Sequence, residues 1–198
     1  IIDDELFEYT GEDTDVTIPE EVATIDDFAI PAKVRSIRFG AHVKAIEAEA
    51  FGSLYEETDL ETIYYDGTIE DWMNIEFGGY LSSIDDLGPV SGNPMLRAKK
   101  VYFQGKLLED IVVPSSVKEI GAGQFQGFEQ AHSIRFGPNV KKIGVAAMKW
   151  SHIEAIYFDG TVEEWRAIKR GKECFPKMFD LYVQGQLVKP ATSSSTAW

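Results

Sequence analysis

The chain has 198 residues, 44% of them hydrophobic, so it is long enough to bury a sizeable core. Its formal net charge of −14 argues against nucleic acid and anionic membrane surfaces as partners, because both need clustered Lys and Arg. The single cysteine, Cys174, excludes an internal disulfide, and no His or Cys pair has metal-ligand spacing. We therefore expect no metal and no cofactor. No apolar run approaches the roughly 20 residues that a membrane-spanning helix needs.

Short triplets of the form apolar, any residue, apolar recur along the chain, each followed by a Pro or Gly turn signal. Side chains alternate between the two faces of a strand, so each triplet predicts a short strand with its first and third residues buried. Within each half of the chain the triplets lie roughly 21 to 26 residues apart, the spacing of leucine-rich repeats. The triplets begin at Val16, Ile37, Ile63, Ile111, Ile134 and Ile156.

The two halves of the chain are copies of one module. Residues 16–25 match 111–120, residues 37–46 match 134–143, and residues 63–72 match 156–165. Three matches in the same order make chance a poor explanation. The sequence therefore predicts a duplicated module of roughly 95 residues whose stacked units bury a continuous core.

Two further segments, 101–108 and 181–188, each place two β-type runs around a Gln-Gly pair. Glycine adopts a positive φ easily, so each segment predicts a tight hairpin. Only about ten residues separate Val101 from Ile111, which is short for another coil of a repeat of this class. We therefore expect the hairpins to be inserts at the module boundaries.

The domain organisation follows from these repeats. We expect one solenoid over residues 1–188, with module one at about 7–100, module two at about 101–180 and a third-module hairpin at 181–188. Residues 76–100 contain Gly-Gly, Gly-Pro and Asn-Pro pairs and predict a long loop. Residues 189–198 are rich in Ser and Thr and predict a flexible tail.

A recurring pattern marks the turns, at Pro114, Val117, Ile120, Gly121 and Phe125, at Val140, Ile143 and Gly144, and at Ala50-Phe51. In this pattern the chain resembles the BspA-like leucine-rich repeats of bacterial, gut-type cell-surface proteins. The resemblance covers about residues 7–188, although Met148 stands where Phe is usual. It implies an α/β solenoid: a right-handed leucine-rich-repeat superhelix with a parallel β-sheet on one face, short helices and loops on the other, and hairpins at the module boundaries. It also implies an extracellular or cell-surface location, an adhesion or interaction role, and no catalytic residues.

An Asp-Gly-Thr-x-Glu-x-Trp block, at 66–72 and again at 159–165 with two conservative changes, is the motif that most suggests chemistry. A structural interpretation accounts for it: Thr and the acid three residues later predict a capping box that opens a helix, and Trp then lies on the buried helical face. The pairs are Thr68 with Asp71 and Thr161 with Glu164. A glycosidase is the alternative, with carboxylates such as Asp159 and Glu163 facing one cleft about 5–10 Å apart.

The middle residue of each triplet should point outward from the sheet, which is the usual binding surface of a solenoid. In stacking order these residues are Thr17, Arg38 and Tyr64, then Val112, Arg135 and Tyr157. Tyr and Arg are enriched at binding hot spots. The other interpretation is that each Arg simply stacks on its Tyr neighbour as a cation–π pair of about 0.5–1 kcal/mol. The candidate ligand-binding residues are Arg38, Tyr64, Arg135 and Tyr157, with Tyr102 and Tyr182 added if the hairpin strands join the same sheet.

We therefore expect a non-catalytic binding or adhesion module that recognises a host or bacterial surface protein or a glycan, without nucleic acid and without membrane insertion. A passive spacer that displays another domain is the alternative, and the Ser-rich end favours it slightly.

Overall fold

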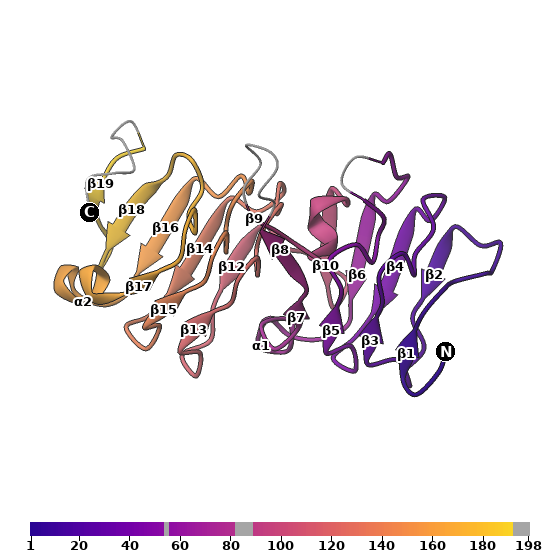
Figure 1. The fold of residues 1–198 in the computed structure, drawn as a ribbon. Coiled ribbons are helices and arrows are strands. Elements are labelled where there is room, and N and C mark those ends of the chain that lie inside the picture. Colours follow the sequence, from indigo (N-terminus) through magenta and orange to yellow (C-terminus); the bar gives the residue numbers. More distant parts are fainter. Residues whose placement is uncertain (54–55, 82–88, 192–198) are drawn as a thin grey trace. The chain divides into compact units, whose positions relative to one another are not determined.

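The structure is a computed structural model that describes residues 1–53, 56–81 and 89–191. The chain forms two compact units, Ile1–Leu107 and Leu108–Trp198, called here the first and the second unit (Figure 1). Each unit is a short β-solenoid. Its turns contribute strands to a main parallel sheet and two-residue strands to a second, shorter parallel sheet.

The main sheet of the first unit contains four parallel strands and one antiparallel strand that closes the edge. Their spatial order is β11-β10-β6-β4-β2. The strands are β2 (Asp15–Thr17), β4 (Ser36–Phe39), β6 (Thr62–Tyr65), β10 (Lys100–Phe103) and β11 (Lys106–Leu107).

The short sheet of the first unit consists of β1 (Glu5–Leu6), β3 (Thr24–Ile25), β5 (Ala45–Ile46) and β7 (Glu76–Phe77). Helix α1 (Ile69–Trp72) connects β6 to β7. Within residues 76–100, predicted as a loop, the structure contains β7, the hairpin of β8 (Gly79–Leu81) and β9 (Pro89–Ser91), and the 3-10 helix η1 (Pro94–Leu96). The sequence missed these elements because each is only two or three residues long.

The second unit repeats this plan. Its main sheet has the order β12-β14-β16-β18-β19, and its short sheet the order β13-β15-β17. The main strands are β12 (Asp110–Val112), β14 (Ser133–Phe136), β16 (Ala155–Phe158), β18 (Asp180–Val183) and β19 (Gln186–Lys189). The other elements are β13 (Glu119–Ile120), β15 (Lys142–Ile143), α2 (Val162–Ala167) and β17 (Lys169–Arg170).

These two units confirm the predicted leucine-rich-repeat solenoid with parallel sheets and few, short helices. One detail differs: the first strand of each hairpin is a full member of its main sheet rather than an insert beside it. β10 pairs in parallel with β6, and β18 pairs in parallel with β16. The second strand of each hairpin then folds back antiparallel and covers the edge, which would otherwise present unpaired backbone groups.

The core lies between the two sheets of each unit and follows the predicted alternation. The inward residues of β4 and β14 are 0–1% exposed, namely Ile37, Phe39, Ile134 and Phe136. A fully buried Trp72 packs against four aromatic rings with centroid distances of 5.2–6.1 Å. Burying each large apolar side chain contributes about 1.5–3 kcal/mol, so this alternating pattern is the main source of stability.

Both predicted capping boxes are present, at Thr68 with Asp71 and at Thr161 with Glu164. In each, the threonine hydroxyl accepts a hydrogen bond from the third helical N–H, and the acidic side chain accepts one from the threonine N–H. The glycine before each threonine is needed for close packing. A Cβ at Gly160 would lie 2.6 Å from the ring of Phe158.

The division between the units falls after Leu107, so the hairpin at 101–107 belongs with the first unit, whereas the sequence placed it at the start of the second module. The predicted tail began at 189, yet Lys189 ends β19 and is 4% exposed. The rest of that segment, residues 192–198, lies outside the described residues. Among the described residues, the structure has no helix with the length and apolar character to cross a membrane.

Candidate functional site

The outward residues of each main sheet form a continuous row in register across five strands. The first outer row is Thr17, Arg38, Tyr64, Tyr102 and Leu107. The second outer row is Val112, Arg135, Tyr157, Tyr182 and Leu187. Because the hairpin strands join the sheets, Tyr102 and Tyr182 extend the rows that the sequence predicted, and all six candidate residues lie in these two rows.

In both rows the arginine is fixed by two neighbours. The Arg38 guanidinium lies 4.9 Å from the ring centroid of Tyr64 and donates a 2.6 Å hydrogen bond to the Asp66 carboxylate. Arg135 repeats this geometry on Tyr157 and Asp159, at 4.9 and 2.6 Å. The four charged side chains are 44–50% exposed, so each ion pair is worth only about 0–1 kcal/mol. Its main effect is to orient the guanidinium.

The tyrosines continue the stack on the other side. Tyr64 and Tyr102 are stacked with ring centroids 5.4 Å apart, and Tyr157 and Tyr182 with centroids 4.9 Å apart. All four tyrosines are half-buried. In the second row, desolvation and the neighbouring Asp180 carboxylate raise the pKa of Tyr182.

This stacking determines what a partner can touch. The strand β6 lies between β4 and β10, so one face of the Tyr64 ring meets Arg38 and the other meets Tyr102. The same argument applies to Tyr157, between Arg135 and Tyr182. A partner would meet mainly ring edges, hydroxyl groups and the adjacent charges. The surface is therefore suited to edge-on contact and hydrogen bonding rather than to stacking on free aromatic faces.

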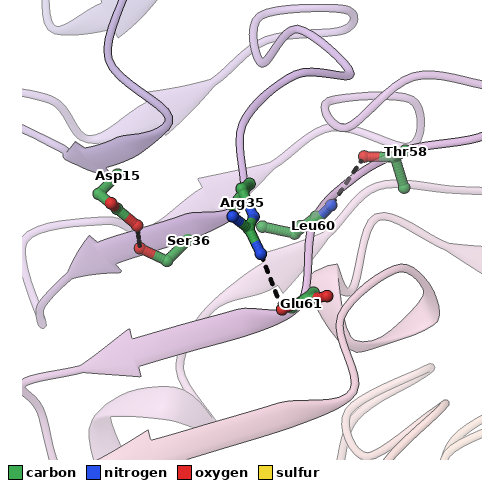
Figure 2. A network of polar contacts seen from close by, with 6 residues as sticks. All are labelled: Asp15, Arg35, Ser36, Thr58, Leu60 and Glu61. Atoms are coloured by element: carbon green, nitrogen blue, oxygen red, sulfur yellow. Dashed lines mark hydrogen bonds and ion pairs between the residues drawn. The ribbon is translucent and has the colours of Figure 1, made fainter.

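Polar contacts at the beginning of the strands hold neighbouring strands of the main sheets together. Figure 2 shows the hydrogen bond of Ser36 to Asp15, at 2.5 Å, and the ion pair of Arg35 with Glu61, at 3.7 Å. It also shows Leu60, whose N–H donates to the Thr58 hydroxyl. In the second unit Ser133 and Asp110 repeat the Ser36 contact at 2.6 Å. These contacts tie β4 to β2 and β14 to β12, and so they keep the outer rows in register.

The acidic block at 159–165 has structural partners. Asp159 binds Arg135, Glu164 belongs to the capping box, and Trp165 is 2% exposed. Glu163, the other carboxylate of the glycosidase alternative, is exposed on the first turn of α2. Across the described ranges no cluster of three or more His, Cys, Asp or Glu side chains could hold a metal ion.

Sequence reasoning missed the aspartates that bind the two arginines, and the leucines that end the outer rows. A signal for the aspartates was present, because an Asp directly follows the strand that contains the row tyrosine in both modules, at Asp66 and Asp159. The leucines, Leu107 and Leu187, needed the hairpin strands to be assigned to the sheet first.

Strands stacked in register, with one row outward and two rows buried, define each unit as a leucine-rich-repeat solenoid. The family model described as BspA type leucine rich repeat region matches residues 1–84 and 98–178 in six copies. The chain therefore belongs to the BspA-type leucine-rich-repeat family.

Among solved structures, the chain is similar to a leucine rich cell surface protein from Faecalibacterium prausnitzii A2-165, with 21% identity and a TM-score of 0.36. The match covers 83% of this chain and 38% of that protein. The chain thus spans well under two thirds of that protein's length. No curated protein matches the sequence.

Proposed function

We propose that the chain is a non-catalytic binding module of a bacterial surface or secreted protein, and that the two outer rows contact its partner. The observation that carries the proposal is the repeated Arg–Tyr–Tyr stack, half-exposed on rigid, registered strands. Binding sites built on strands hold their side chains in place before the partner arrives, which lowers the entropic cost of association. Tyr and Arg are also the residue types that supply binding hot spots.

A protein partner fits this surface better than a glycan does. Sugars commonly pack their apolar face on a free aromatic face, but the central tyrosines have neighbours on both faces. Protein interfaces use tyrosine edges and hydroxyls together with arginine, as antibody paratopes do. The proposed partner is therefore a folded protein surface rather than a carbohydrate.

The surface or secreted location is supported by membership of the BspA-type family. The surplus of 33 acidic over 19 basic residues supports it as well, because acidic exteriors favour solubility.

A second candidate function is that of a passive spacer. The specific observation in its favour is that Arg38 and Arg135 already have carboxylate partners within the chain. Such a stack stabilises a sheet without any external ligand. Two observations distinguish a binding module from a passive spacer: whether the chain binds a partner, and whether that binding requires the residues of the outer rows.

The test uses the whole chain, immobilised, to capture partners from host and bacterial surface proteins, with a glycan array in parallel. Arg135→Ala with Tyr157→Ala should weaken binding of a captured protein by about 30-fold or more, as for a hot spot. The same should hold for Arg38→Ala with Tyr64→Ala if the first row also takes part. The matched control is Lys169→Ala with Trp150→Ala, which lies outside both rows.

Unchanged affinity in both row variants would place the binding site elsewhere. Binding to glycans with no protein captured would overturn the choice of partner. If neither assay finds a partner, the spacer function stands.

A further inference from the structure

A cavity of about 640 Å³ lies in the second unit, between α2, the chain segment after β17, and the strands β18 and β19. This volume is within the roughly 300–1,000 Å³ typical of small-molecule sites. The cavity is separate from the outer rows, since its walls come from the interior side of β18 and β19, at Leu181 and Lys189. An inference drawn from it is therefore independent of the proposed function.

The cavity lies where the two units differ in sequence. When the third repeated block is extended beyond its Trp, Phe77 in the first unit corresponds to Arg170 in the second. The structure agrees, because Phe77 pairs with Ile46 in β5 and Arg170 pairs with Ile143 in β15. In the first unit this position holds an aromatic ring 5.4 Å from the Trp72 ring. In the second it holds a cation.

Arg170 keeps the aromatic contact and adds a charge. Its guanidinium carbon lies 5.0 Å from the Trp165 centroid and 5.8 Å from the Phe175 centroid, and it donates a 2.5 Å hydrogen bond to the Trp165 carbonyl. The Nε of Arg170 and the indole Nε1 of Trp165 are both buried without a hydrogen-bond partner. Buried donors without partners are costly, so two residues of this cavity wall carry unmet hydrogen-bonding capacity.

Lys189 supplies a second cation with no counterpart in the first unit. In the hairpins, Lys189 corresponds to the exposed Glu109, and β19 is two residues longer than β11. The lysine is 4% exposed, and its ammonium lies 4.2 Å from the Phe179 centroid. The ammonium group of Lys189 has no hydrogen bond or ion pair to the described part of the chain. Burial accordingly lowers the pKa of Lys189.

Three stacked or tilted rings connect the two cations. Trp165 stacks on Phe175 with centroids 5.5 Å apart, and Phe175 contacts Phe179 at 5.3 Å. Arg170 lies at the Trp165 end of this run and Lys189 at the Phe179 end. The cavity thus has an aromatic wall with a positive charge at each end.

The remaining charges leave the cavity strongly positive in an otherwise acidic chain. Lys149 and Lys177 also line it, and the acid that lines it, Glu173, forms a 2.5 Å ion pair with Lys149. A cleft lined by one sign of charge with low-dielectric walls concentrates ligands of the opposite sign. Within the residues that line the cavity, Arg170, Lys177 and Lys189 have no carboxylate paired with them.

We propose that this cavity is a binding site for a small, ring-bearing carboxylate. The carboxylate is recognised by the cations Arg170 and Lys189, and the ring of the ligand packs on the Trp165–Phe175–Phe179 wall. Charge-assisted hydrogen bonds to a carboxylate are about twice as strong as neutral ones, which favours a charged ligand over a neutral one at this site. An aromatic acid and an acidic sugar share this chemistry.

The test is calorimetric titration of the whole chain with phenylacetate and with glucuronate, each beside its neutral analogue, 2-phenylethanol or glucose. We expect saturable binding of at least one carboxylate, and affinity at least about ten-fold weaker for the neutral analogue, the usual loss for one charge-assisted hydrogen bond. Tighter binding of phenylacetate would identify the ligand class as an aromatic acid, and tighter binding of glucuronate would identify it as an acidic sugar. In parallel, the indole N–H resonance of Trp165 should shift with the carboxylate and not with its neutral analogue.

Two variants assign the site. Lys189→Gln removes one cation and leaves a polar side chain that is one atom shorter, and Arg170→Phe installs the residue found at the matching position of the first unit. Each should weaken carboxylate binding by about ten-fold or more, while Lys169→Gln, an exposed neighbour on β17, should leave it unchanged. Circular dichroism checks that the variants fold, and Lys189→Gln alone decides if Arg170→Phe does not. The proposal is overturned if neither carboxylate saturates, if the neutral analogues bind equally well, or if Lys189→Gln binds as tightly as the parent chain.

Discussion

The two units share their outer rows and differ at the end of their third turn. In both rows the Arg–Tyr distance is 4.9 Å and the Arg–Asp hydrogen bond is 2.6 Å. At the third turn, by contrast, the first unit places the half-buried Phe77 beside Trp72, and the second places Arg170 beside Trp165 and a cavity. Contacts that depend on strand register were preserved in both copies. The positions that differ lie outside the outer rows, at Phe77 in β7 and Arg170 in β17 of the short sheets and at Lys189 at the end of β19.

The difference has an energetic consequence. Trp72 contacts four aromatic rings, whereas Trp165 contacts three aromatic rings and a guanidinium and lines a cavity. Interiors are normally packed as densely as organic crystals, so a tryptophan that borders an open pocket makes fewer packing contacts, which is a cost in stability. The second unit tolerates that cost at the place where we propose a ligand site.

The largest expected effect comes from removing the two matched tryptophans. Trp72→Ala should destabilise the chain by about 5 kcal/mol, and Trp165→Ala by nearer to about 3 kcal/mol, because Trp165 already borders empty space. Urea unfolding followed by circular dichroism measures both. Trp150→Ala is the control, since that indole is 40% exposed, and it should cost about 0.5–1 kcal/mol. A larger loss for Trp165 than for Trp72 would contradict the comparison of the two cores.

The matched glycines Gly78 and Gly171 give a smaller effect that should be similar in both units. A Cβ at Gly78 would lie 2.7 Å from the backbone nitrogen of Ala48, and one at Gly171 would meet the nitrogen of Val145 more closely still. Alanine at either position should cost about 1–3 kcal/mol in urea unfolding, because the neighbouring backbone cannot yield easily. Gly137→Ala has open space around the added carbon and should change stability by less than about 0.5 kcal/mol. Equal effects at all three positions would show that the turns are not packed as described.

The smallest effect is a pH dependence that arises from the capping box of the first unit. Hydrogen bonds from the Thr68 hydroxyl and N–H lower the pKa of Asp71 below its ordinary value of 3.8. The ionised carboxylate therefore contributes stability that is present above pH 3.8 and is lost as the pH falls through the lower pKa of the folded state. The Asp71→Asn variant should be less stable than the parent chain at neutral pH, and the difference between their urea midpoints should shrink as the pH falls through this range. The Thr68→Ala variant lacks the hydroxyl that lowers this pKa, so its stability should also depend less on pH than that of the parent chain. A difference that stays constant with pH would contradict the assignment.

Sequence patterns predicted the repeating core and the row residues because both depend on strict alternation. Ile37, Arg38 and Phe39 are placed inward, outward and inward by the period of a strand alone. The strands of the short sheet are mostly two residues long and carry no period, so they were not predicted. The role of the hairpins was missed because the ten-residue distance from Val101 to Ile111 is shorter than one repeat. That comparison does not apply, since Val101 lies in the last parallel strand of the first unit and Ile111 in the first strand of the second.

The sequence indicates that the two modules differ near this cavity, but it does not reveal the cavity itself. Comparing the modules beyond the shared Trp shows Phe77 replaced by Arg170. From the sequence alone, an arginine at this position would be expected to lie exposed on the surface. Only the structure shows that Arg170 is half-buried against Trp165, and that Lys189 turns into the same space.

The central claim is that the outer rows form the partner surface, and hydroxyl-radical footprinting of the chain with a captured protein partner tests it most directly. Oxidation of each exposed side chain is measured with and without the partner. The account predicts that Tyr157 and Tyr182, or Tyr64 and Tyr102, lose reactivity together. Phe28 and Met178, which are 56% and 66% exposed outside the rows, should keep theirs. The opposite result, with all four tyrosines fully reactive in the complex while Phe28 or Met178 becomes protected, would contradict the claim.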